Sequence, residues 1–306
     1  MNFSHPIART QLCICILFCF FAALNPAIAE PINPAQYQAQ RLASFNTFDA
    51  RQAVAVDKEH FYAIHNFRIT QHDKTSGKPL LQWDGESDQN GRLIHLDSGV
   101  VWQGKLYAAH SNYPHWPMTS SVEIWEAKTL KHLNSHSFGI QLGSFTWLDR
   151  HKGHWWGGFG NYNKVQKNQS QVYGFTHNTQ VVKMDDQFNI LQKWVLPKAI
   201  SHRIAPMSNS GGSWGADGYL YLTGHDHQEV YVMKLPRYGS ELIWVATVFV
   251  EGMEGQGIAW DRSEKGIFWG ILKKERKVLK FKMPTIQAQQ LTAEQETLRV
   301  RDFNKN

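Results

Sequence analysis

The sequence contains no cysteine after position 19, and its three cysteines, Cys13, Cys15 and Cys19, lie in one short apolar run. Beyond that run, the lack of thiols excludes disulfide crosslinks, thiol nucleophiles, zinc–thiolate sites and iron–sulfur clusters. Charged residues are scarce at 19% of the 306 residues, whereas apolar residues reach 42%. This composition excludes disordered and collagen-like chains and supplies enough apolar material for a large core.

Several motifs with known chemistry are also missing. The sequence has no G-x-S-x-G nucleophile elbow and no glycine-rich phosphate loop that opens a helix, so serine hydrolase and P-loop chemistry are not indicated. The chain has a net charge of +6, but its basic residues are dispersed apart from the run at 273–277, which we interpret as a solvated strand end. No helix-turn-helix or similar module is present, so we expect no nucleic-acid partner.

The first 29 residues have the features of a secretory signal. Arg9 precedes an apolar run at 12–24, and Ala27-Ile28-Ala29 forms an A-x-A cleavage site. An uncleaved membrane anchor is the alternative, but the run is shorter than the ~20 apolar residues that span a bilayer. We therefore predict a signal peptide over 1–29 and a periplasmic or secreted mature protein without a membrane span.

An internal repeat organises the rest of the chain. Apolar runs, each followed by a Gly or Asp turn and an aromatic run, begin near residues 53, 99, 143, 211 and 257. This order is typical of a β-hairpin. Alternating apolar stretches follow each hairpin, and a further apolar strand usually comes after them. Four-stranded repeats of roughly 40–50 residues predict the blades of a β-propeller.

We predict an all-β fold, a five-bladed β-propeller over residues 30–284, followed by a polar C-terminal tail at 285–306. The fifth unit ends after its third strand, whereas the strand at 41–45 has no unit of its own. We expect this N-terminal strand to complete the last blade and close the ring, because closure leaves few free sheet edges. An insertion at 166–178 and a link at 197–208 explain the longer third unit.

Polar loops gather at one predicted mouth of the central channel. The loops that lead into the innermost strands and those that join second to third strands surround the same mouth. Matching positions in three units hold His65, His110 and His225, so we expect these imidazoles to approach one axis. The candidate ligand-binding residues in these loops are His65, His95, Asp97, Asn112, Tyr113, Trp116, Asn209, Asp226, His227 and Gln256.

Three chemistries fit such a mouth. His65, His110 and His225 could hold a divalent metal ion, the one cofactor that the residues suggest. His110, His225 and Glu254 could instead be catalytic acids and bases near neutral pH. The loops could also hydrogen-bond a polar ligand without chemistry. With 15 histidines in the chain, exposed loop histidines without function are a further interpretation.

Some segments resemble known propeller families. Residues 257–261, 98–107 and 214–218 resemble the glutaminyl-peptide cyclotransferase propellers of plants and bacteria. That family has a Glu-Gly pair at the start of an inner strand, where the Glu handles proton transfer. Here Ser98-Gly99 stands at the comparable position, so the resemblance implies the fold and not the activity. Residues 95–101, 208–215 and 224–227 are similar to exported propellers labelled cycloisomerase.

Two functions from different classes follow. The first is an enzyme that cyclises, isomerises or opens the lactone ring of a small polar molecule, with Tyr113 and Trp116 walling the site. The alternative is a non-catalytic propeller of the cell envelope that holds a peptide, glycan or protein. A quinone-dependent dehydrogenase ranks last, because no motif facing such a cofactor is present.

Overall fold

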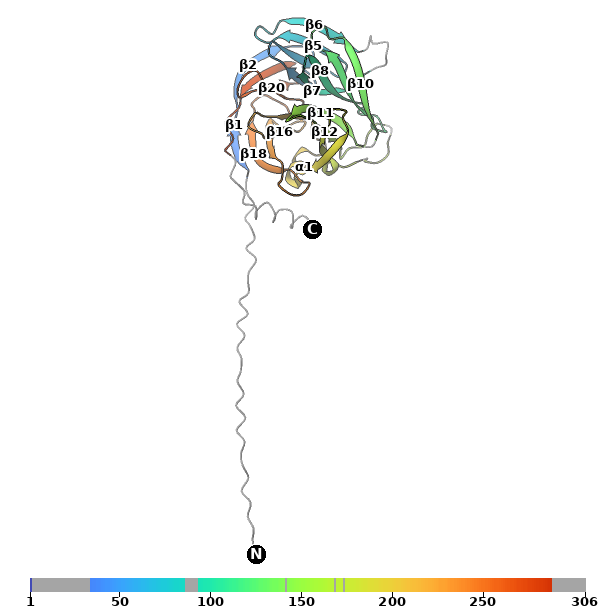
Figure 1. Cartoon of the computed structure of the whole chain (residues 1–306), viewed down its shortest axis with the longest axis vertical. Helices are drawn as coiled ribbons and strands as arrows, with labels where there is room; N and C mark the ends of the chain where they lie inside the picture. Colours follow the sequence, from blue (N-terminus) through green and yellow to red (C-terminus); the bar gives the residue numbers. More distant parts are fainter. Residues whose placement is uncertain (2–33, 86–92, 141, 168, 173, 288–306) are drawn as a thin grey trace. The chain divides into compact units, whose positions relative to one another are not determined.

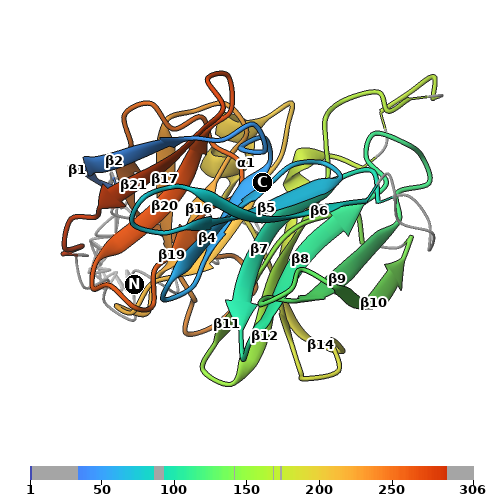
Figure 2. The same cartoon turned by 90° about the horizontal axis from the view of Figure 1, so that it is seen from above.

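The repeats form five separate β-sheets in the computed structural model, which describes Met1 and residues 34–287 apart from 86–92, 141, 168 and 173 (Figure 1). Residues 2–29 of the predicted signal peptide lie outside the described residues, as does the predicted tail from 288 onward. The sheets follow one another in a ring, so that the blue N-terminal strands lie beside the orange and red C-terminal ones (Figure 1). Figure 2 shows the same sheets from above.

Each sheet is one blade, with its strands in chain order from the hub outward. Blade 1 comprises β3 (Ala53–Val56), β4 (His60–Ile64), β5 (Arg68–Asp73) and β6 (Pro79–Asp84). Blade 2 comprises β7 (Leu96–Trp102), β8 (Lys105–Ser111), β9 (Ser120–Glu126) and β10 (His132–Gly139). Blade 3 comprises β11 (Ser144–His151), β12 (His154–Gly160), β13 (Gln180–Met184) and β14 (Ile190–Val195).

The last two blades also contain N-terminal strands. Blade 4 comprises β15 (Gly211–Trp214), β16 (Leu220–Thr223), β17 (Glu229–Lys234) and β18 (Ile243–Phe249), with β1 (Ala35–Gln38) at its outer edge. Blade 5 comprises β19 (Ala259–Trp260), β20 (Ile267–Leu272) and β21 (Lys277–Lys282), with β2 (Gln40–Asn46) outermost.

The innermost strands close the ring. Strand β3 contacts β7, and the contacts continue through β11, β15 and β19 back to β3. The hub is crowded, since a Cβ at Gly257 would lie 2.3 Å from the Cβ of Ala53. These contacts confirm the predicted five-bladed propeller.

The N-terminal segment completes the last blade, as predicted. Strand β2 pairs antiparallel with β21, with Phe45 opposite Val278. The sequence did not predict β1, which pairs in parallel with β18 of blade 4. Ala39 lies between the two strands and is buried. The N-terminal segment therefore joins blades 4 and 5.

The core consists of five hydrophobic clusters, one at each junction between neighbouring blades. Aromatic residues of the repeat fill them, as expected for blade faces. Trp147 of blade 3, for example, packs in the same cluster as Trp214 of blade 4. Burial of these faces fixes the angle between blades and thus the positions of the mouth loops.

The longer third unit contains the short helices η1 (Thr176–Asn178) and α1 (Lys198–Ile204). Both fall in the segments in which the sequence predicted an insertion and a link. Within the described residues, no helix combines the length and the hydropathy that a membrane crossing requires.

Candidate functional site

A cavity of about 740 Å³ opens at the mouth of the hub, among the two sets of loops in which the sequence predicted it. All five blades contribute to its wall, through Arg51, Gln52, Asn66, Ile94, His95, Asp97, Tyr113, Pro114, His115, Thr146, Tyr162, Lys164, Pro206, Met207, Ser210, His225, Asp226, Gln256 and Lys273. Its volume suits a small molecule, since ligand pockets range over roughly 300–1,000 Å³.

A β-bulge in blade 2 places Asp97 in the cavity wall. The register between β7 and β8 shifts between Leu96 and Gly99, so Leu96 remains in the apolar core while Asp97 borders the cavity. Bulges commonly redirect a side chain in this way next to binding sites. The carboxyl group of Asp97 is buried, and its Oδ2 has no hydrogen-bond partner within the described residues.

His95 lies beside this carboxyl group. Its Nε2 is 3.6 Å from Asp97 Oδ2, and its ring packs 5.0 Å from the ring of Tyr113. Burial, with a smaller contribution from the neighbouring His110, lowers the pKa of His95 to about 3, so the ring is neutral near pH 7. Burial raises the pKa of Asp97 well above its ordinary value, which favours the protonated form.

Two tyrosines form an aromatic wall next to this pair. The rings of Tyr113 and Tyr162 are 5.1 Å apart, and both line the cavity. Tyr162 is buried, which raises the pKa of its hydroxyl group. The two rings therefore form an aromatic part of the cavity wall beside His95 and Asp97.

Two further predicted residues meet at the rim. His225 Nδ1 lies 2.6 Å from Asp226 Oδ1, and the carbonyl of His225 accepts a hydrogen bond from Gln256 Nε2 at 3.4 Å. Asp226 is 72% exposed, so this contact faces solvent at the opening. Of the predicted site residues, His95, Asp97, Tyr113, His225, Asp226 and Gln256 line the cavity.

Sequence reasoning missed three cations of the wall, Arg51, Lys164 and Lys273. The run at 273–277 is not solvated throughout, because Lys273 is half-buried in the cavity wall while Lys274 is exposed. Arg51 occupies the loop that leads into blade 1, the same loop class as His95 and Gln256. A comparison of these loops between units would have found it.

The other predicted histidines do not line the cavity. His65 is buried between Phe48, at 6.1 Å, and Phe67, at 4.7 Å, and burial lowers the pKa of His65 to about 4. His110 belongs to β8, where its Nδ1 lies 3.0 Å from Ser121 Oγ, and burial lowers its pKa to about 4. Among the residues that the structure describes, no group of three or more His, Cys, Asp or Glu side chains could hold a metal ion. The metal site predicted from His65, His110 and His225 is therefore not formed.

The remaining candidates have structural contacts outside the cavity wall. The amide of Asn112 bonds within its own loop, to Pro117 O at 2.8 Å. Asn209 is buried and accepts a hydrogen bond from Trp147 Nε1. His227 Nε2 lies 3.1 Å from Arg203 O, and Glu254 pairs with Lys274 at 2.7 Å. Trp116 is half-buried near the mouth but does not line the cavity. A ligand role for these residues stays a prediction.

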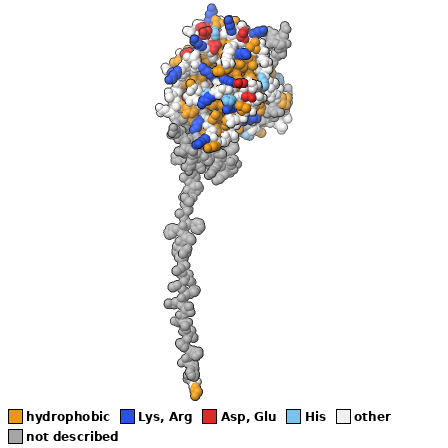
Figure 3. Space-filling view, in the orientation of Figure 1, with side chains coloured by type: hydrophobic (Ala, Val, Ile, Leu, Met, Phe, Trp, Pro, Cys, Tyr) orange, Lys and Arg blue, Asp and Glu red, His pale blue; other side chains and the backbone are white. Residues whose placement is uncertain are grey.

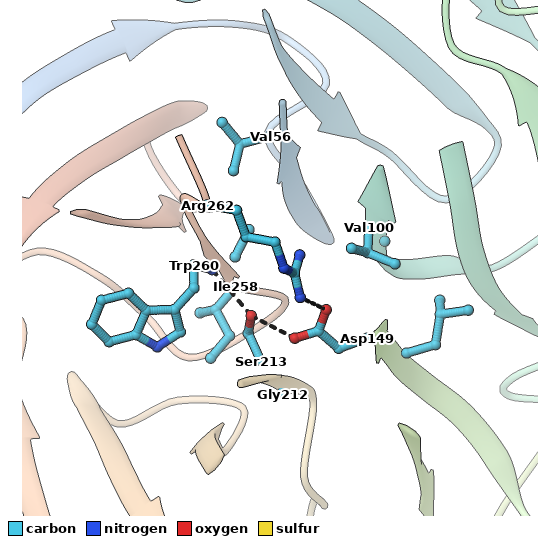
Figure 4. A pocket seen from close by; sticks show the side chains of 11 residues that line it. Val56, Val100, Asp149, Gly212, Ser213, Ile258, Trp260 and Arg262 are labelled. Atoms are coloured by element: carbon cyan, nitrogen blue, oxygen red, sulfur yellow. Dashed lines mark hydrogen bonds and ion pairs between the residues drawn. The ribbon is translucent and has the colours of Figure 1, made fainter. Parts of the chain in front are cut away.

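The opposite end of the inner strands holds only a pocket of about 10 Å³, roughly the space of one water molecule (Figure 4). Asp149 lies at its centre, where it accepts hydrogen bonds from Ser213 Oγ at 3.0 Å and from Trp214 N at 2.7 Å. Arg262 pairs with the same carboxylate (Figure 4). Side chains thus fill the hub at this end, and the ligand-sized space is at the mouth.

The fold and cavity define a five-bladed β-propeller with a small-molecule-sized cavity at one end of its hub. No protein-family model matches the sequence, and no curated protein matches it significantly.

Three solved structures illustrate the likeness in fold. The PQQ-bound aldose sugar dehydrogenase from Streptomyces coelicolor has 11% sequence identity over 78% of this chain and 80% of that chain, with a TM-score of 0.46. A luciferin-regenerating enzyme has 8% identity over 82% of this chain and 97% of that chain, with a TM-score of 0.45. The β-propeller domain of Myceliophteria thermophila Cps50 (Swd1) has 8% identity over 80% of this chain and 100% of that chain, with a TM-score of 0.44. These similarities concern the fold alone and assign no activity to this chain.

Proposed function

We propose that this protein is an exported enzyme that moves a proton within a small polar molecule bound in the mouth cavity. The reaction class is a cyclisation, an isomerisation or a lactone ring opening. The observation that supports it most directly is the buried Asp97, a residue of the cavity wall whose Oδ2 has no hydrogen-bond partner within the described residues, beside the neutral His95.

The chemistry follows from the protonation state of Asp97. A carboxyl group with a raised pKa keeps its proton near neutral pH and so has one to donate, and once deprotonated it is a stronger base than an exposed carboxylate. Asp97 therefore gives its proton to one atom of the ligand and then, as a carboxylate, takes a proton from another. The reaction is redox-neutral, and the proton count of the enzyme is unchanged at its end.

Neighbouring side chains support this step. The imidazole of His95, 3.6 Å away, orients the carboxyl group without adding a charge. Tyr113 and Tyr162 keep the reacting atoms away from bulk water.

The first experiment is a ligand screen by thermal shift on the full-length mature protein. Small polar acids, lactones, amides and peptides with N-terminal glutamine are tested, since a ligand that binds only the folded state raises Tm. Ligands that raise Tm are then incubated with the protein, and products are followed by NMR. Ligands that bind without turnover would support the alternative, a non-catalytic binding propeller.

The Asp97→Asn substitution tests the catalytic assignment. We expect turnover to fall by about 10²–10⁴-fold, the usual contribution of general acid–base catalysis, while the Tm shift on ligand binding persists. Asp186→Asn is the matched control, because Asp186 is an exposed carboxylate in the loop between β13 and β14, and turnover should not change. Undiminished turnover in Asp97→Asn would show that this residue does not transfer the proton.

A further inference from the structure

Two positively charged side chains of the cavity wall have no anionic partner. Arg51 lies in the loop between β2 and β3, and Lys273 lies in the loop between β20 and β21. Blades 5 and 1 are neighbours in the ring, so these two loops are adjacent. Within the described residues, neither side chain forms an ion pair, and Arg51 Nε is buried without a hydrogen-bond partner.

The two charges act on each other. Burial lowers the pKa of Lys273, and the guanidinium of Arg51 lowers it further. Like charges in a partly dehydrated space repel more strongly than in water, because the local dielectric constant is lower. Arg51 and Lys273 therefore repel each other in the cavity wall, and a bound anion would reduce this repulsion.

Within the described residues, the carboxylates that act electrostatically on Lys273 have other partners or are held toward the neutral form. The carboxylates nearest Lys273 are Asp97, Asp226 and Glu254. Asp226 pairs with His225 at 2.6 Å, and Glu254 pairs with Lys274 at 2.7 Å. The carboxyl group of Asp97 is held toward its neutral form.

We propose that Arg51 and Lys273 form an anion subsite that binds the carboxylate or phosphate group of a small organic acid. Arginine offers a planar fork that matches either oxyanion, and lysine adds a compact positive charge. This inference deepens the proposed function and rests on the mouth cavity as the ligand site, but not on catalysis by Asp97.

The subsite also orients the ligand. With its oxyanion at Arg51 and Lys273, the carbon skeleton extends into the cavity, whose wall also contains Pro114, Met207 and Tyr113. Asp97 lines the same cavity and interacts electrostatically with Lys273. The ligand class is therefore a small organic acid.

The test measures Tm of the full-length mature protein against paired probes at constant ionic strength. The carboxylate arm compares malate and citrate with their amides, and the phosphate arm compares glucose 6-phosphate and glycerol 3-phosphate with glucose and glycerol. We expect a dose-dependent rise in Tm for members of one oxyanion arm and none for the neutral analogues. The arm whose probes raise Tm identifies the bound oxyanion as a carboxylate or a phosphate group. Equal shifts with neutral analogues, or no shift in either arm, would overturn the subsite.

Charge-removing variants locate the binding. Arg51→Gln and Lys273→Gln should each weaken binding of the oxyanion probe by at least 10-fold. Without ligand, Tm of each variant should stay equal to that of wild type or rise, because the repulsion between the two charges is removed. Lys274→Gln is the matched control, since Lys274 is the next residue of the same loop, carries the same charge and is 83% exposed. If Lys274→Gln weakens binding of the oxyanion probe to the same extent, the binding reflects only the general positive charge of the loop, and the subsite is overturned.

The Asp97→Asn variant separates the two proposals. Anion binding that persists in Asp97→Asn and is lost in Lys273→Gln supports the subsite even where no turnover is found. Turnover that depends on Asp97 but is insensitive to Arg51→Gln and Lys273→Gln overturns the subsite and leaves the proposed function standing.

Discussion

At the scale of single residues, burial of neutral histidines makes the stability of this protein depend on pH. His65 and His110 have pKa values lowered to about 4, and that of His95 is lowered to about 3, all chiefly by burial. In the unfolded chain, the pKa of histidine is about 6.5. From pH 6.5 down to these values, the unfolded state binds more protons than the folded state. The free energy of unfolding therefore decreases as the pH falls through this window.

His65→Phe should reduce the decrease in the free energy of unfolding at low pH. His65 is 6% exposed between two phenylalanine rings, so a phenyl ring suits its surroundings. We expect a free energy of unfolding near that of wild type at pH 7.5. Below pH 6.5 the variant should gain up to about 1.4 kcal/mol relative to wild type for each pH unit, down to pH 4. Urea unfolding at pH 7.5, 6 and 5 measures this, with the exposed His177→Phe as a control that should show no such gain. Parallel pH profiles for wild type and His65→Phe would contradict the role of burial.

The sequence predicted which loops form the mouth more reliably than which side chains face the cavity. His95, Asp97 and His225 were found because their loops occupy equivalent places in the repeat. His110 was assigned to a loop, but it lies in β8, where alternating side chains face opposite sides of the blade. A shift of one residue therefore decides whether a side chain enters the cavity or packs between blades.

At the scale of elements, strand β2 closes the ring through its aromatic side chain as well as its backbone. The ring of Phe45 lies 5.1 Å from that of Phe61 in blade 1 and 5.9 Å from that of Trp269 in blade 5. It therefore links the last blade to the first. Leu42 of the same strand is 48% exposed.

Phe45→Ala should destabilise the propeller by about 2–4 kcal/mol, because it removes a large aromatic side chain from the junction of blades 5 and 1. Leu42→Ala changes the same strand at an exposed position and should cost less than about 1 kcal/mol. Urea unfolding of both variants at pH 7.5 gives the comparison. Similar losses for the two variants would mean that β2 holds the ring only through its backbone pairing with β21.

The strands that carry the apolar repeat were predictable, and those without it were not. The four-stranded pattern located the five inner strands within a few residues, because each one combines apolar residues with a turn. Strand β1 escaped because its four residues, Ala35-Gln36-Tyr37-Gln38, give too short an alternating pattern, and it pairs at the outer edge of blade 4. Helix α1 escaped because seven residues in a link give too short a periodic pattern.

At the scale of the whole molecule, the two ends of the hub differ in character. Lys and Arg side chains are scattered over the face displayed in Figure 3, with fewer Asp and Glu side chains among them. The mouth keeps a cavity with unpaired cations, whereas the opposite end is filled around Asp149 (Figure 4). Asp149 of blade 3 bonds to blade 4 through Ser213 and to the segment after β19 through Arg262. A single carboxylate thus connects three blades across the axis.

Asp149→Ala should therefore destabilise the ring as a whole. The carboxylate is 1% exposed, and its removal leaves Ser213 Oγ, the Trp214 amide and the Arg262 guanidinium without their acceptor. A buried donor left without its acceptor costs about 1–3 kcal/mol, whereas an exposed ion pair contributes about 0–1 kcal/mol. Glu275→Ala is the control for an exposed pair, because Glu275 bonds Lys277 at 2.5 Å and is 56% exposed. Urea unfolding should show a single transition that shifts to lower denaturant in Asp149→Ala and hardly moves in Glu275→Ala. Equal midpoints in the two variants would show that the blades are held by their apolar junctions alone, without a polar connection across the hub.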